Sequence, residues 1–94
     1  MFVIVLTYTK PLPEVDALMR KHMAWLNEQY AAGRFVVSGR QIPRTGGVIL
    51  ARGPRAAVEA YLESDPFKTH GIADFAVTEI DVTTAVAGVE ALKG

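Results

Sequence analysis

A twenty-residue helical pattern with one histidine on its apolar stripe constrains the possible folds of this chain more than any other feature of the sequence. Residues 13–32 predict a helix, because Pro13 suits a first turn and Gly33 suits the position just after the last turn. At about 100° per residue, the apolar side chains of this segment fall on one stripe, and His22 lies near its middle as the only ionisable residue. A histidine in that place needs a hydrogen-bond partner, which in the simplest case is a backbone carbonyl.

Strand patterns lie on both sides of this helix. Residues 2–8 are β-branched and aromatic without alternation, as in a strand buried on both faces. Residues 34–39 and 48–52 predict two more strands, joined as an antiparallel hairpin by a polar loop in which Gly46 and Gly47 are expected to supply the turn.

A second helix pattern and a last strand pattern follow the hairpin. Gly53 and Pro54 open the helix, which carries its apolar residues on one face. Residues 72–82 alternate, with Phe75 and Val77 on one face and Ala76 on the other. Residues 83–94 are rich in alanine and valine and could form a short helix.

The predicted order is therefore β-α-β-β-α-β. With helices on one face of a four-stranded antiparallel sheet, this is an α+β fold of the ferredoxin-like plait type. Two helices cannot cover all the apolar residues of such strands. We therefore expect a homodimer formed through the open sheet face.

Composition limits the possible partners. Ninety-four residues, half of them hydrophobic, fit one domain over residues 1–94. Ten basic and ten acidic side chains balance, so neither nucleic acid nor a membrane surface is expected as a partner. The lack of cysteine excludes disulfides, thiolate nucleophiles and cysteine-ligated zinc. The apolar start of the chain is too short for a signal peptide or a membrane span, so a soluble cytoplasmic protein is expected.

The connection between the second helix and the last strand gathers several reactive and rigid groups. It contains Ser64-Asp65-Pro66-Phe67, and His70 follows three residues later. Asp before Pro commonly caps a turn, which is the simpler interpretation of Asp65. The alternative is that this connection reaches the first helix, where Asp65 would accept the imidazole N–H of His22 and fix its tautomer. The second ring nitrogen would then be free to act as an acid or base on a bound molecule.

Five segments together resemble the YciI-like (YCII-related) domain family. They are residues 20–26, 33–34, 37–39, 46–49 and, above all, 64–67. The resemblance covers nearly the whole chain and implies a ferredoxin-like plait that dimerises as an α+β barrel. It also implies an enzyme with a His–Asp pair, and relatives include dehalogenases of chlorinated muconolactones.

By that resemblance, His22 and Asp65 are the expected catalytic pair, while Ser38 and Gly39 line the expected pocket. The chain departs from the family pattern after Gly39, where Arg40 and Gln41 replace a proline or small residue. Arg40 could pair with a substrate carboxylate, or it could be a solvated loop residue.

Two further residues of the connection are candidates for substrate contact. Phe67 is expected to anchor the turn in the core beside the pocket, and His70 either faces the pocket or lies in an exposed turn. Two histidines and one aspartate in this order match no metal-ligand spacing, and no nucleotide-binding motif occurs, so no metal or cofactor is expected.

We therefore expect general acid–base chemistry on a small organic acid, lactone or enol: isomerisation, elimination with dehalogenation, or hydrolysis. The alternative is a non-catalytic binding or assembly module, since this fold hosts many functions.

Overall fold

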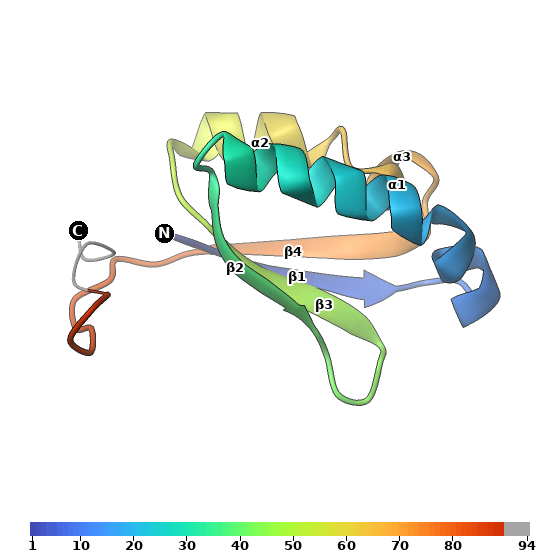
Figure 1. Cartoon of the computed structure of the whole chain (residues 1–94), viewed down its shortest axis with the longest axis horizontal. Helices are drawn as coiled ribbons and strands as arrows, with labels where there is room; N and C mark the ends of the chain where they lie inside the picture. The colour runs from blue at the N-terminus through green and yellow to red at the C-terminus, as the bar shows by residue number, and fades with distance from the viewer. Residues whose placement is uncertain (90–94) are drawn as a thin grey trace.

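One antiparallel sheet carries all the described helices on one of its faces. The computed structural model describes residues 1–89. Its four strands are β1 (Phe2–Tyr8), β2 (Phe35–Arg40), β3 (Gly46–Ala51) and β4 (Ala73–Glu79), in the sheet order β2-β3-β1-β4. The helices α1 (Leu12–Ala31), α2 (Arg55–Leu62) and α3 (Pro66–Thr69) lie together on one side of this sheet (Figure 1). This confirms the predicted α+β plait, while α3 was predicted only as a turn.

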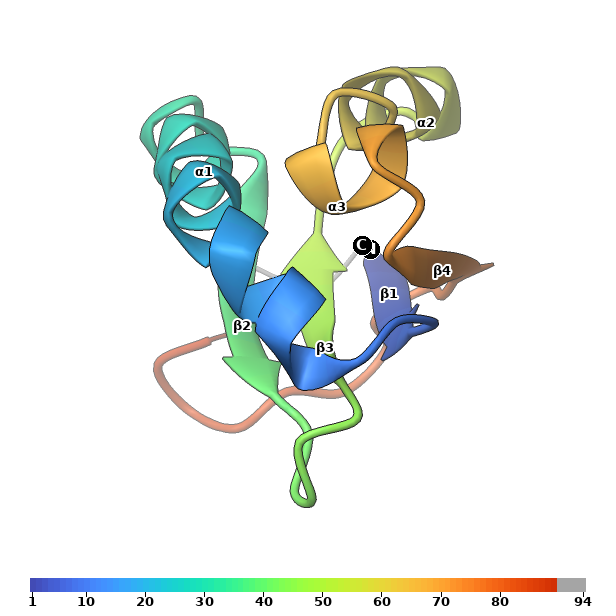
Figure 2. The same cartoon turned by 90° about the vertical axis from the view of Figure 1, so that its right-hand side faces the viewer.

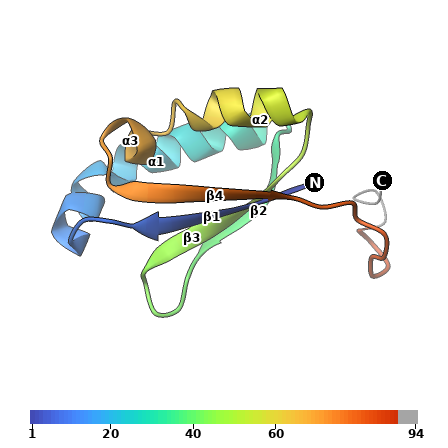
Figure 3. The ribbon, with the colours of Figure 1, turned by 180° about the vertical axis from the view of Figure 1, so that it is seen from behind.

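The alternating burial of the strands defines the two faces of the sheet. Phe2, Ile4 and Leu6 of β1 are buried toward the helices, and they pair across the ladder with Ala51, Ile49 and Gly47 of β3. Side chains between these positions, such as Val5 and its partner Val48, point to the other face and are half-buried. No helix of residues 1–89 covers that second face (Figure 3).

Helix α1 crosses the sheet with its apolar stripe inward. Pro11 precedes the helix in an extended conformation, and Gly33 follows it with a positive φ of 74°, the conformation that a side chain disfavours. Val15, Trp25 and Leu26 are buried against the sheet, and His22 is buried among them. The predicted helix boundaries are therefore correct to within one residue.

The prediction that Gly46 and Gly47 form the hairpin turn is wrong. Both residues lie inside β3, where Gly46 pairs with Thr7 and Gly47 pairs with Leu6 and Arg40. A Cβ atom built on Gly46 would lie 1.7 Å from the carbonyl oxygen of Leu6. Glycine is therefore needed at position 46 for close backbone approach rather than for a turn, and residues 41–45 make the loop.

The C-terminal part of the chain also differs from the prediction. Strand β4 ends at Glu79, three residues before the predicted end, although its predicted alternation of faces is correct. Residues 80–89 contain no helix, and residues 90–94 of the predicted helical tail lie outside the described residues. No described helix is long and apolar enough to cross a membrane.

Helix α3 brings the end of the second helical unit back to α1. Viewed along the sheet, α3 lies between α1 and α2, above the strands (Figure 2). Its Phe67 is fully buried in the common core, together with Leu62 of α2 and Ile72 just before β4. The fold thus places α3 and the residue before it beside α1, about forty positions away in the sequence.

Candidate active site

His22 and Asp65 form a buried hydrogen bond. His22 Nδ1 lies 2.8 Å from Asp65 Oδ1, and the two residues are 7% and 0% exposed. The same Oδ1 accepts the backbone N–H of Phe67 at 3.0 Å. An ionised Asp65 carboxylate can only accept, so Nδ1 of His22 donates in this bond, and a neutral His22 keeps Nε2 unprotonated. Nε2 has no hydrogen-bond partner within residues 1–89.

Asp65 therefore has both of the roles that the sequence offered as alternatives. It is the N-cap of α3, with an extended backbone (φ −63°, ψ 125°), and Pro66 occupies the first helical position. Capping fixes the carboxylate where it also meets the imidazole. Its second oxygen, Oδ2, is buried without a hydrogen-bond partner in the described chain, which is costly for a carboxylate. The negative charge of Asp65 is thus directed at His22 and is poorly compensated elsewhere.

Aromatic rings hold the imidazole in its plane. The Phe67 ring stacks on His22 with centroids 3.9 Å apart and an interplanar angle of 2°. The centroid of the Trp25 ring lies 5.8 Å from that of His22, and the indole N–H of Trp25 donates to Ser64 Oγ at 2.9 Å. Ser64 in turn donates to the carbonyl of Tyr61. The segment from Ser64 to Phe67 therefore positions His22 directly, through the Asp65 hydrogen bond and the Phe67 ring, and indirectly, through the bond between Ser64 and Trp25.

His22 opens on a cavity of about 210 Å³ between α1 and the sheet. Its apolar wall comes from β1, β3 and α1, and includes Leu6, Met19, Leu26 and Ile49. Gly47 lies on the helix-facing side of β3, by its pairing with Leu6, and leaves space because it has no side chain. A cavity of roughly 150 Å³ accommodates a benzene ring, so this one fits a single ring with substituents.

The predicted pocket residues are mostly found together. Ser38, Gly39 and Arg40 of β2 and Phe67 of α3 all line the cavity with His22. Ser38 is held by the Tyr30 hydroxyl at 2.6 Å.

His70 does not line the cavity. It is exposed at the C-terminus of α3, where its Nδ1 contacts the carbonyl of Pro66 at 3.0 Å and the Thr69 hydroxyl. Within residues 1–89, no group of three or more His, Cys, Asp or Glu side chains is arranged to hold a metal ion.

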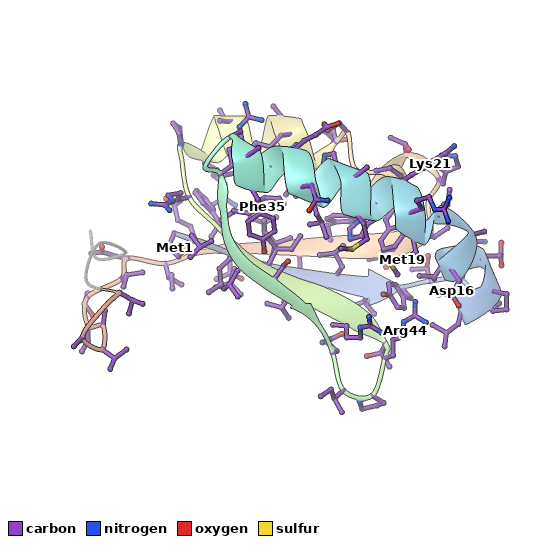
Figure 4. All side chains as sticks on the ribbon, in the orientation of Figure 1. Met1, Asp16, Met19, Lys21, Phe35 and Arg44 are labelled. Carbon is purple, nitrogen blue, oxygen red and sulfur yellow. The ribbon has the colours of Figure 1, made fainter. Side chains whose placement is uncertain are left out.

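Sequence reasoning missed Arg44, which lies in the loop between β2 and β3 and also lines the cavity. Its Nη2 donates to Asp16 Oδ1 at 2.5 Å, and its guanidinium carbon lies 6.0 Å from the centroid of the Tyr8 ring. Figure 4 shows the Arg44 and Asp16 side chains pointing toward each other. The hydrogen bond that Arg44 donates to Asp16 raises the pKa of its guanidinium, a group that is always charged in proteins. Arg44 and Asp16 are 28 residues apart, so no local pattern signals their contact.

Comparisons with known proteins agree with this architecture. The family model of the YCII-related domain matches residues 1–81. No curated protein matches the sequence. Among solved structures, the chain is similar to 5-chloro-2-hydroxyhydroquinone dehydrochlorinase from Burkholderia phenoliruptrix AC1100 in complex with 2,5-dihydroxybenzoquinone. The TM-score is 0.71 at 19% identity, over 86% of this chain and 94% of the other. At this identity the likeness concerns the fold.

Proposed function

This chain belongs to the YCII-related domain family, and we propose that it is a small-molecule enzyme in which His22 transfers a proton. The observation that carries the proposal is the 2.8 Å bond from His22 Nδ1 to the fully buried Asp65. That bond leaves Nε2 without a partner among residues 1–89, on a residue that lines a ring-sized cavity. A positioned acid or base of this kind contributes roughly 10²–10⁴-fold to a rate.

The chemistry supported best is proton removal followed by elimination or isomerisation. Nε2 accepts a proton from an O–H or C–H bond of the substrate, and the electron pair of that bond forms a new π bond. In an elimination, the leaving group departs with the electron pair of its bond, and the imidazolium then releases its proton to the leaving group or to water. In an isomerisation, the new π bond displaces an existing π electron pair, which takes the proton back from the imidazolium at another atom. Asp65 stabilises the imidazolium formed in the first step, because its carboxylate accepts the hydrogen bond from Nδ1 throughout the reaction. Phe67 keeps the ring in position during the transfer.

A similar fold in a dehydrochlorinase supports this choice of reaction. That protein is crystallised with a dihydroxylated benzoquinone, a single six-membered ring. The cavity beside His22 has room for a substrate of this size. We therefore favour single-ring enols, lactones and organic acids as substrates.

The competing function is a non-catalytic binding or assembly module in which the His22–Asp65 pair only stabilises the fold. Asp65 caps α3 and therefore has a structural role whether or not chemistry occurs. A shared fold does not choose between these functions, so the decision has to come from the site.

Matched histidine variants separate the two functions. Thermal shift and turnover are measured with a panel of single-ring compounds that includes 2,5-dihydroxybenzoquinone and 5-chloro-2-hydroxyhydroquinone, the latter assayed by chloride release. We expect ligands to stabilise the parent and the His70→Gln variant equally, because His70 lies outside the cavity. His22→Gln should lose turnover. Ligands that stabilise all three proteins alike without turnover would favour the binding module. No ligand at all, with a large stability loss in His22→Gln, would favour the assembly module.

We also propose a homodimer that covers the open sheet face. Val3, Val5, Val48 and Leu50 are half-buried on the face away from the helices, and Val37 beside them is 51% exposed. Contiguous apolar area of this kind favours association. Light scattering coupled to gel filtration should give the mass of two chains, and a concentration-independent mass of one chain would rule the dimer out.

A further inference from the structure

The cavity beside His22 has a chemically distinct opening at the loop between β2 and β3. Two arginines, Arg40 and Arg44, line it there, and none of its lining residues in the described chain is an aspartate or glutamate. The wall below them is mainly apolar. A positive group at the edge of an apolar cavity strengthens the attraction for an anion, because little water is available to screen it.

Arg44 is better placed than Arg40 to act on a bound anion. Its side chain is 26% exposed, and it is oriented by the Asp16 bond on one side and by the Tyr8 ring on the other. Arg40 is exposed, and its side chain has no hydrogen bond or ion pair within residues 1–89. An arginine already held in place loses less conformational freedom when it binds a ligand.

The guanidinium of Arg44 keeps most of its donors unused. Of its five N–H bonds, one on Nη2 is directed to Asp16, and the Tyr8 side chain also interacts with the guanidinium. Nε is enclosed without a partner, so the group is poorly compensated for its partial burial. Asp16 itself is 56% exposed at its side chain, so water weakens its hold on the positive charge.

Ring contacts connect Arg44 to His22 along one side of the cavity. Arg44 lies over Tyr8, the Tyr8 ring meets Phe67 edge-on at 6.0 Å, and Phe67 stacks on His22. A single-ring ligand in the cavity therefore has the arginine at one end and the imidazole at the other. We propose that Arg44 binds an anionic group of the ligand, a carboxylate or an ionised enol, and so selects anionic single-ring substrates for His22.

That the ligand is a substrate rests on the proposed function, but the test of Arg44 measures ligand binding and needs no turnover. Benzoate and benzamide have nearly the same shape and differ in charge, and their affinities are measured by NMR titration of the parent protein. We expect benzoate to bind at least about tenfold more tightly than benzamide, since hydrogen bonds between charged groups are the stronger kind. Equal affinities, or no saturable benzoate binding by the parent, would overturn the inference.

Variants assign the selectivity to one arginine. Arg44→Gln should weaken benzoate binding about tenfold or more and leave benzamide unchanged, whereas Arg40→Gln should change benzoate binding less than threefold. Asp16→Asn, which keeps Arg44 and removes its competing carboxylate, should retain or strengthen benzoate binding. If Arg44→Gln and Asp16→Asn both leave the affinities at the parent values, Arg44 is only one half of a surface ion pair. His22→Gln should still bind benzoate, so loss of turnover in that variant reports on the proton-transfer proposal alone.

Discussion

The inner end of the cavity and its opening are built in different ways. At the inner end, Asp65 is wholly buried and is fixed by a helix cap, and His22 is fixed by Asp65 and Phe67. At the opening, Arg44 is tied to the exposed Asp16 by a single ion pair. An aspartate is therefore part of the core at one end of the cavity and part of a surface contact at the other. Under the two proposals, the packed core positions the proton-transfer group, whereas the β2–β3 loop supplies the arginine that binds the ligand.

Replacing the two aspartates is the strongest way to break this comparison. Asp65→Ala removes the cap of α3 and leaves the His22 N–H without its acceptor, so we expect a loss of about 2–4 kcal/mol in the free energy of unfolding. It should also reduce any turnover by roughly 10²–10⁴-fold. Asp16→Ala should change the free energy of unfolding little, because surface ion pairs contribute little to stability. Urea unfolding of both variants provides the measurement, and similar losses from both would show that the two ends do not differ.

A second buried oxygen shows that poor compensation alone does not make a site. The Tyr61 hydroxyl is buried without a partner in the described chain, as Asp65 Oδ2 is, but Tyr61 does not line the cavity. Burial raises the pKa of Tyr61 above its usual value of 10.0, and the nearby positive charge of Arg34 opposes this shift. The folded state therefore holds the phenol proton more tightly than the unfolded chain does.

Tyr61→Phe should consequently have a small effect with a defined sign. Near neutral pH the variant should be as stable as the parent, or more stable by up to about 1 kcal/mol, because an unpartnered polar atom is removed. The stabilisation from the raised pKa is fully present below the unfolded pKa of about 10 and is lost as the pH rises through the folded value. The parent should therefore lose stability relative to the variant above about pH 10, as measured by urea unfolding at pH 8 and pH 11. A variant clearly less stable than the parent at pH 8 would show that the hydroxyl has a favourable role.

The two ends also differ in how far the sequence predicts them. His22 stands out because an ionisable residue interrupts an apolar helical stripe, and Asp65 stands out because it precedes a proline after a helix. Their contact follows from a plait in which both helices cover one sheet face. The sequence left two alternatives for Asp65, the cap of a turn or the hydrogen-bond partner of His22. The structure shows both, because one oxygen of Asp65 accepts two N–H bonds.

What the sequence did not predict depends on tertiary contact. Arg44 looks like an ordinary loop residue until α1 brings Asp16 beside it and β1 brings Tyr8. Gly46 looks like a turn residue until β1 places the Leu6 carbonyl where a Cβ atom would be. His70 comes soon after the segment from Ser64 to Phe67, but α3 directs it toward the outside of the protein. Local pattern identifies groups with unusual surroundings, and packing decides which of them share a cavity.

The ring nitrogens of His22 provide the most direct test of the central claim, that Asp65 holds His22 with Nε2 free in the cavity. Nitrogen-15 NMR of the imidazole distinguishes a protonated from an unprotonated nitrogen, and it is recorded with the ring in its neutral form. In the parent we expect the neutral ring to carry its proton on Nδ1, with Nε2 unprotonated, because Oδ1 of Asp65 can only accept. Asp65→Ala should lose this preference. A parent spectrum with the proton on Nε2, unchanged in Asp65→Ala, would contradict the account.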